Sequence, residues 1–154
     1  MNLDLIKSLR TGLLLESRNI LIPWRATFSE LKKLEPSKIV SESNERTDLL
    51  WENEKILNGF AIDLIVIKWS GLISLNRKFK YAFAYISKED FGKLKVKLDQ
   101  ELGLIPKYKR KNELEFLYSY ELDCVRITLK ENDRFGPYWT IDIKHKSLIN
   151  RILR

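Results

Sequence analysis

The sequence predicts an α+β protein in which antiparallel strands form one or more sheets and helices pack on one face. The first observation is that several short segments alternate apolar and polar residues, which is the period of a β-strand. The second is a segment with apolar side chains at intervals of three and four residues, which is typical of an amphipathic helix. With 154 residues, 44% of them hydrophobic, the chain is long enough to form a single domain with its own core.

The N-terminal residues predict a short helix and one strand. Leucines recur at near-helical spacing through residues 3–17, and Thr11 and Gly12 interrupt this pattern. We expect a strand over residues 14–22, which Pro23 ends because proline cannot continue a hydrogen-bonded ladder.

A second short helix is predicted from a capping box. In this motif the hydroxyl of Thr27 and the carboxylate of Glu30 accept hydrogen bonds from backbone amides at the start of the helix, and Pro36 stops it. The following residues 37–47 are mostly polar, and we expect them to form a loop.

The centre of the chain is typical of an antiparallel meander. Residues 49–57 and 60–67 are predicted strands, and the Asn58-Gly59 pair between them favours a tight hairpin turn because both residues tolerate positive φ. Residues 79–85 alternate large aromatic side chains with small or charged ones, so they predict a third strand.

The clearest helix is predicted to begin after Ser87, whose hydroxyl can accept a hydrogen bond from the first free amides. Its apolar side chains form one stripe, which consists of Phe91, Leu94, Leu98 and Leu102. Gly103 is suited to the left-handed conformation that often ends a helix.

The C-terminal third predicts three further strands after a basic loop at residues 107–111. Apolar and polar side chains alternate in residues 114–120, 125–130 and 138–145, which we expect to be strands. A short helix is expected from Ser147 onward.

A helix followed by antiparallel strands is thus predicted twice. We expect one domain over residues 1–154. The hypothesis of an internal duplication divides this domain into two α-β-β-β half-units, residues 1–86 and 87–154.

The composition excludes several classes of protein. The single cysteine, Cys124, cannot form an internal disulfide, and the single histidine, His145, cannot build a histidine-based metal cluster. Nucleotide-binding and hydrolase motifs are absent from the sequence, so we expect no cofactor, no bound metal and no enzymatic activity. The first ten residues lack a secretory signal pattern and the longest apolar run, residues 60–69, is too short to span a bilayer. We therefore expect a cytoplasmic protein without membrane association.

The aromatic residues are the most informative feature for function. They make up 11% of the chain, and a domain of this size is not expected to bury all of its large rings. Exposed Trp and Tyr beside charged residues are typical of the positions that contribute most to protein–protein binding. We therefore expect a protein-binding module, whose candidate partner-binding residues are Trp51, Trp69, Tyr118 and Tyr120.

The positive charge supports an alternative in which the chain binds nucleic acid. The sequence carries 28 Lys and Arg against 21 Asp and Glu, a net charge of +7. The candidate phosphate-binding residues are Lys107, Lys109, Arg110 and Lys111. They adjoin strands rich in aromatic side chains, on which bases can stack.

A metal-dependent nuclease of the restriction-enzyme type is a lesser alternative. Asp142-Ile143-Lys144 matches the short acidic-x-Lys pattern of such enzymes, with Asp123 or Asp133 as the second acid. The carboxylates would hold a divalent ion that activates water, and the lysine would stabilise negative charge. This three-residue pattern has low specificity in a lysine-rich chain.

Three segments carry a resemblance to known proteins. These are Ile22-Pro23-Trp24, the capped helix at residues 27–31, and Leu50-Trp51 before a strand meander. Together they resemble small bacterial proteins associated with polymorphic toxin systems. The repeated helix-and-strand unit is also similar in outline to β-lactamase-inhibitor-type and BamE-like folds, which bind other proteins through an exposed sheet face. The resemblance implies a protein that binds its partner stoichiometrically. More specifically, it implies an immunity protein that blocks a toxin. In such families the members that block a basic nuclease are usually acidic, whereas this chain is basic. The difference in charge concerns the class of toxin more than the binding role.

Overall fold

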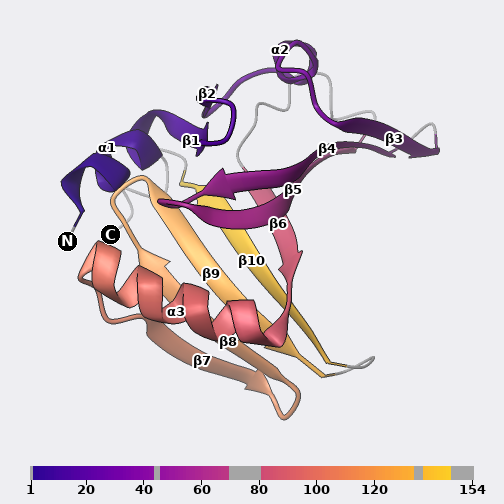
Figure 1. Ribbon diagram of the computed structural model, residues 1–154. Helices are drawn as coiled ribbons and strands as arrows, with labels where there is room; N and C mark the ends of the chain where they lie inside the picture. The colour runs from indigo at the N-terminus through magenta and orange to yellow at the C-terminus, as the bar shows by residue number, and fades with distance from the viewer. Residues whose placement is uncertain (1, 44–45, 70–80, 134–136, 147–154) are drawn as a thin grey trace.

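The computed structural model describes residues 2–43, 46–69, 81–133 and 137–146, and this part of the chain folds as an α+β protein with antiparallel sheets (Figure 1). Its helices are α1 (Leu3–Thr11), α2 (Phe28–Lys32) and α3 (Lys88–Leu102). The strands before α3 are β1 (Gly12–Leu15), β2 (Ile20–Pro23), β3 (Lys38–Ser43), β4 (Arg46–Ile56), β5 (Phe60–Trp69) and β6 (Tyr81–Ile86). The strands after α3 are β7 (Lys107–Asn112), β8 (Glu115–Glu121), β9 (Val125–Asn132) and β10 (Tyr138–His145).

The large sheet joins two sets of four strands. Its order is β3-β4-β5-β6-β10-β9-β8-β7, and β1 and β2 form a separate hairpin. A helix precedes each set, α2 before β3–β6 and α3 before β7–β10. The sets meet where β6 pairs antiparallel with β10, with Ala84 opposite Ile141. Each helix is therefore followed by four strands rather than the predicted three. The internal duplication of the sequence stays a prediction.

The helices pack on one face of the large sheet, and the core lies between them and the strands. Figure 1 shows α3 lying across the half of the sheet formed by β7–β10. The buried side chains on this face of β8, β9 and β10 are Tyr120, Val125, Ile127, Leu129, Ile141 and Ile143. The opposite face is polar at its centre, where Lys130 forms an ion pair with Asp142. We call this second surface the open face.

Both predicted helix caps are confirmed. The Ser87 hydroxyl accepts a hydrogen bond from the Asp90 amide at 3.0 Å, and Gly103 ends α3 with φ of 60°. The Thr27 hydroxyl accepts from the Glu30 amide at 3.2 Å, while the Glu30 carboxylate accepts from the Thr27 amide at 2.6 Å. These side chains satisfy backbone donors that have no partner within the helix.

The prediction of one strand over residues 14–22 is wrong, because the chain turns in the middle and forms the β1–β2 hairpin. The turn residue Asn19 has φ of 54°. Arg18, in the same turn, forms an ion pair with the buried carboxylate of Glu54 and donates to the Glu35 carbonyl at 2.6 Å. The polar residues of the turn therefore fix the hairpin to β4 and to the segment after α2.

Both predicted polar loops are strands instead. Residues 38–43 of the segment 37–47 form β3, and the segment 107–111 belongs to β7. These are the outer strands of the large sheet, and each pairs with only one neighbour. An outer strand has side chains exposed on both sides, so it lacks the alternating pattern that identifies a half-buried strand.

The remaining strands agree with the sequence. Asn58 and Gly59 have φ of 70° and 92° in the turn that joins β4 and β5, as the hairpin prediction requires. The three predicted C-terminal strands correspond to β8, β9 and β10. The predicted helix from Ser147 lies outside the described residues, as does the start of the strand predicted at residues 79–85. Within the described ranges, no helix combines the length and apolar character needed to cross a membrane.

Two glycines provide a test of this packing. Gly12 directly follows α1 and is the first residue of β1, where a Cβ atom would stand 2.2 Å from the Ile22 carbonyl oxygen. Gly92 lies in α3, where a Cβ atom would meet nothing within 4 Å. We expect Gly12→Ala to lower the free energy of unfolding by about 1–3 kcal/mol through this clash. Gly92→Ala should raise it by roughly 0.5–1 kcal/mol, because alanine favours a helix interior.

Urea unfolding followed by circular dichroism measures both changes. The two variants make the same chemical change, so Gly92→Ala controls for the added methyl group. Equal free energies of unfolding for Gly12→Ala and the parent protein would contradict the close contact between β1 and β2.

Candidate functional site

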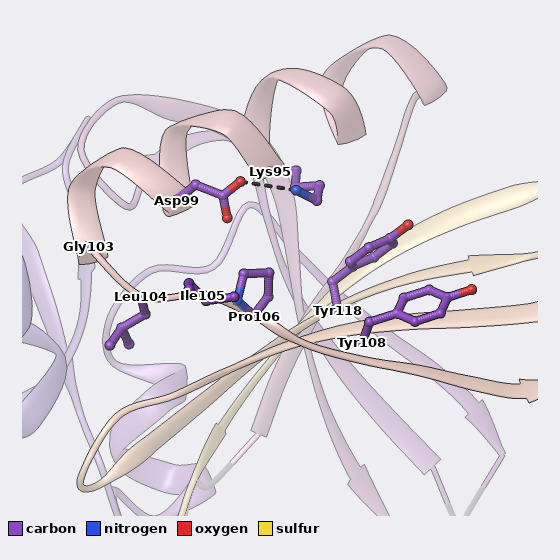
Figure 2. Close-up of a pocket in the computed structure, with 8 residues that line it drawn as sticks. All are labelled: Lys95, Asp99, Gly103, Leu104, Ile105, Pro106, Tyr108 and Tyr118. Carbon is purple, nitrogen blue, oxygen red and sulfur yellow. Dashed lines mark hydrogen bonds and ion pairs between the residues drawn. The ribbon is translucent and has the colours of Figure 1, made fainter.

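A surface groove of about 510 Å³ lies between the second half of α3 and the strands β7 and β8 (Figure 2). It is lined by Lys95, Asp99, Gly103, Leu104, Ile105, Pro106, Tyr108 and Tyr118. We call it the α3–β7 groove. Its walls are mainly apolar and aromatic, and one ion pair lies on its helical side.

The end of α3 positions one side of the groove. Gly103 takes the left-handed conformation, and three residues then lead directly into β7. This short connection keeps β7 next to the helix and exposes Ile105, whose surface is 96% accessible. A branched apolar side chain this exposed is unfavourable in water, and covering it is a source of binding energy.

Two tyrosines form the aromatic wall. Tyr108 on β7 is directly opposite Tyr118 on β8, and their ring centroids lie 5.3 Å apart. Tyr118 also contacts Phe91 of α3 edge to face at 6.0 Å, and Tyr108 stacks on Phe116 at 6.3 Å. Figure 2 shows the two tyrosine rings side by side. Tyr108 remains 55% exposed, so its ring is held in place and accessible at once.

Lys95 and Asp99 form the polar wall on successive turns of α3. Their charged groups pair at 3.0 Å, and the Lys95 ammonium lies 5.5 Å from the centre of the Tyr118 ring. The hydroxyl of Tyr120 donates to Asp99 Oδ1 at 2.7 Å. Burial raises the pKa of Tyr120 well above its ordinary value, and the Asp99 carboxylate raises it further. The phenol therefore stays protonated and acts as a hydrogen-bond donor to Asp99.

The predicted basic residues all lie on β7, beside the groove. Tyr108 and Arg110 share the side that faces the groove, and Arg110 lies 5.6 Å from the centre of the Phe116 ring. Lys107 and Lys109 alternate with them and project on the open face. Lys111 occupies an irregularity in the ladder and pairs with Glu115 at 3.2 Å.

The predicted aromatic binding residues separate into three cases. Trp51 and Tyr120 have accessible surfaces of 0%, so neither can contact a partner, and the prediction is wrong for both. The Trp51 indole donates to the Leu34 carbonyl, just after α2, at 3.3 Å, and the Tyr120 hydroxyl donates to Asp99 of α3. Tyr118 lines the groove. The side chain of Trp69 lies outside the part that the structure describes.

Sequence reasoning missed Tyr108 and Ile105. Tyr108 was hidden within the segment interpreted as a basic loop, although Lys107-Tyr108-Lys109 already alternates as a strand does. Nothing in the sequence identifies Ile105, because its exposure depends on the path between α3 and β7.

The acids of the nuclease hypothesis do not come together. Asp142 and Lys144 share the open face of β10, and Asp142 lies opposite Thr128 in the middle of β9. Asp123 precedes β9 and pairs with Arg10 at 3.2 Å, while Asp133 follows the last residue of β9. Asp123 and Asp133 therefore lie at opposite ends of β9, each five residues along the chain from Thr128, the residue opposite Asp142. The described ranges contain no group of three or more His, Cys, Asp or Glu side chains placed to hold a metal.

Comparisons with protein-family models, with curated proteins and with solved structures find no match to this chain.

The contact between Tyr120 and Asp99 supports a stability prediction. Tyr120→Phe removes the donor to Asp99, and we expect the free energy of unfolding to fall by about 1 kcal/mol at neutral pH. The difference should shrink above pH 10, because the pKa of Tyr120 is raised in the folded protein and the unfolded phenol loses its proton first. Urea unfolding at pH 7, 9 and 11 measures this difference. A difference that stays constant over that range would contradict the raised pKa.

Tyr118→Phe is the matched control. Tyr118 lies on the same side of the same strand, and its hydroxyl makes no hydrogen bond within the described ranges. This variant should be nearly as stable as the parent protein at all three pH values.

Proposed function

We propose that this chain is a non-enzymatic protein-binding module whose partner docks in the α3–β7 groove. The observation that carries the proposal is the exposure of Ile105 and Tyr108 next to Tyr118 at one edge of an otherwise well-packed fold. Exposed apolar and aromatic side chains around a hollow are typical of the central residues of protein interfaces.

The fixed orientation of the rings supports this proposal. Tyr108 and Tyr118 contact each other, and Phe116 and Phe91 hold each from a second side. A partner therefore meets rings that are already ordered, which lowers the entropic cost of binding. Lys95 and Asp99 pair with each other, and Asp99 also accepts the Tyr120 hydroxyl. Such a wall supplies polar contacts for binding rather than a poised acid or base.

The sharper form of the proposal is an immunity protein that neutralises a toxin in the cytoplasm. Its support is the resemblance of the chain to proteins of polymorphic toxin systems. Co-expression tests it once a partner has been captured. A toxin expressed alone should arrest growth, and this chain should restore it.

Nucleic-acid binding is the second candidate function. It is favoured by the position of Lys107, Lys109, Arg110 and Lys111, all exposed on β7 beside the aromatic wall. Basic side chains next to accessible rings are the elements of a surface for single-stranded nucleic acid.

A capture experiment with matched variants tests the leading proposal. We would immobilise the parent protein, Ile105→Gln and Val96→Gln, and expose each to lysate of the cell that encodes the protein, once with nuclease treatment and once without. Val96 is a second exposed branched residue, on α3 but outside the groove. We expect one protein to be retained in stoichiometric amount by the parent and by Val96→Gln. Ile105→Gln should retain at most about a tenth as much. A buried aliphatic anchor contributes roughly 1.5–3 kcal/mol to binding, and its loss lowers the affinity about tenfold or more.

The washes separate the two functions. A protein partner held by apolar contacts should remain bound between about 50 and 200 mM salt, whereas nucleic acid should be released steeply over that range. Retention of nucleic acid alone would favour the second candidate. Equal retention of a protein by both Gln variants would show that the groove is not the binding site.

A further inference from the structure

We propose that the partner contributes an acidic, extended peptide segment that pairs with the free edge of β7 as a ninth strand of the large sheet. This inference rests on the proposed function and specifies the chemistry of the partner. Three features carry it: the unpaired edge of β7, the alternation of its side chains, and the charge of the side that faces away from the groove.

The edge of β7 offers main-chain groups to a partner. β7 is the last strand of the sheet, and in the described part of the chain it pairs with β8 alone. In an antiparallel pair, alternate residues direct their N–H and C=O groups toward the neighbour, and the residues between direct theirs outward. Half of the main-chain groups of β7 are therefore available to an added strand, which is the basis of strand-addition binding.

The side chains of β7 define where those of an added strand would lie. Tyr108 points toward the groove, while Lys107 and Lys109 point to the open face. Side chains of a paired strand alternate in the same way. One set would therefore lie beside Tyr108 and Ile105, and the other set beside the two lysines. The groove side fits apolar or aromatic residues, because its exposed lining is Ile105 and Tyr108.

The lysines define the charge of the second set. Within the described ranges neither Lys107 nor Lys109 forms an ion pair, whereas Lys111, two residues further, pairs with Glu115. Carboxylates opposite Lys107 and Lys109 would supply the missing charges and would stabilise the cross-strand pairs. The occupant that satisfies both sides is a peptide that alternates acidic and apolar residues.

A peptide explains more of this surface than a nucleic acid does. A nucleic acid would use the lysines and the rings, but it would leave the outward N–H and C=O groups of β7 without strand partners. Strand addition uses all three features at the same positions.

Model peptides provide the probe. The test peptide is capped Glu-Leu-Glu-Phe-Glu-Leu-Glu with a fluorescent label, and binding is measured by anisotropy. The comparison peptides replace each Glu by Lys, or methylate the amide nitrogens of either alternate set of residues. An oligothymidylate of about twelve nucleotides represents single-stranded nucleic acid. The acidic peptide should bind, and the lysine peptide should bind at least about tenfold more weakly.

Methylation tests the main-chain pairing. One of the two methylated peptides should lose binding by about tenfold or more, because its blocked amides are those that donate to β7. The other should retain binding, because its methyl groups point away from the sheet. Equal affinities of both methylated peptides and the parent peptide would overturn strand addition.

Charge reversal on the protein tests the role of the lysines. Lys107→Glu with Lys109→Glu should weaken the acidic peptide by at least about tenfold and should bind the lysine peptide more tightly than the parent protein does. The gain for the lysine peptide cannot result from misfolding. Lys7→Glu with Lys33→Glu makes the same change in net charge away from β7, and it should leave both affinities within about twofold.

The outcomes distinguish this inference from the proposed function. If the acidic peptide fails to bind while Ile105→Gln still abolishes capture of a protein from lysate, strand addition is overturned and the binding groove stands. If the oligothymidylate binds, the peptides do not, and no protein is captured from lysate, the basic strand serves nucleic acid and both proposals are overturned.

Discussion

The pairing of β6 with β10 is the constraint on which the rest of the structure depends. It joins two four-stranded sets into one sheet, with Ala82 and Ala84 opposite Ile143 and Ile141. Because the sets extend in opposite directions from this junction, the first strand of each, β3 and β7, becomes an outer edge. The candidate site exists at β7 for this reason. The strand that follows α3 in sequence lies at the margin of the sheet, where the helix covers it incompletely.

The sequence predicts the parts of this fold that depend on local chemistry. α3 is recognisable because Ser87, its apolar stripe and Gly103 each act within a few residues. The two outer strands are not recognisable in the same way. β7 is mostly basic and β3 combines two exposed apolar residues with polar ones, and both are strands because a neighbouring strand supplies their hydrogen bonds. The position of such a neighbour is a property of the whole sheet, and no window of sequence contains it.

The candidate site shows the same limit on prediction from sequence. Tyr118 and Tyr120 are two residues apart on β8 and share the helix-facing side, so the sequence ranks them equally as binding residues. Their environments differ in how far α3 and the core cover them, because Tyr120 has no accessible surface whereas Tyr118 is only partly buried. Tyr120 lies beneath the helix and bonds to Asp99, whereas Tyr118 lies at the margin and lines the groove. The distinction between a core tyrosine and a surface tyrosine is therefore set by the placement of α3.

The two edges of the sheet differ in chemistry, and the difference bears on what each can pair with. β3 exposes Ile39 and Val40, whereas β7 exposes Lys107 and Lys109. Lysines on an edge strand disfavour pairing with a second copy of the same edge, because the added strand would bring like charges together. The same lysines favour a strand that carries carboxylates at the matching positions. The positive charge on β7 thus disfavours pairing with a second copy of β7 and favours pairing with an acidic strand. The same two lysines produce both effects, so the discrimination between the two partners needs no contact outside the strand pair.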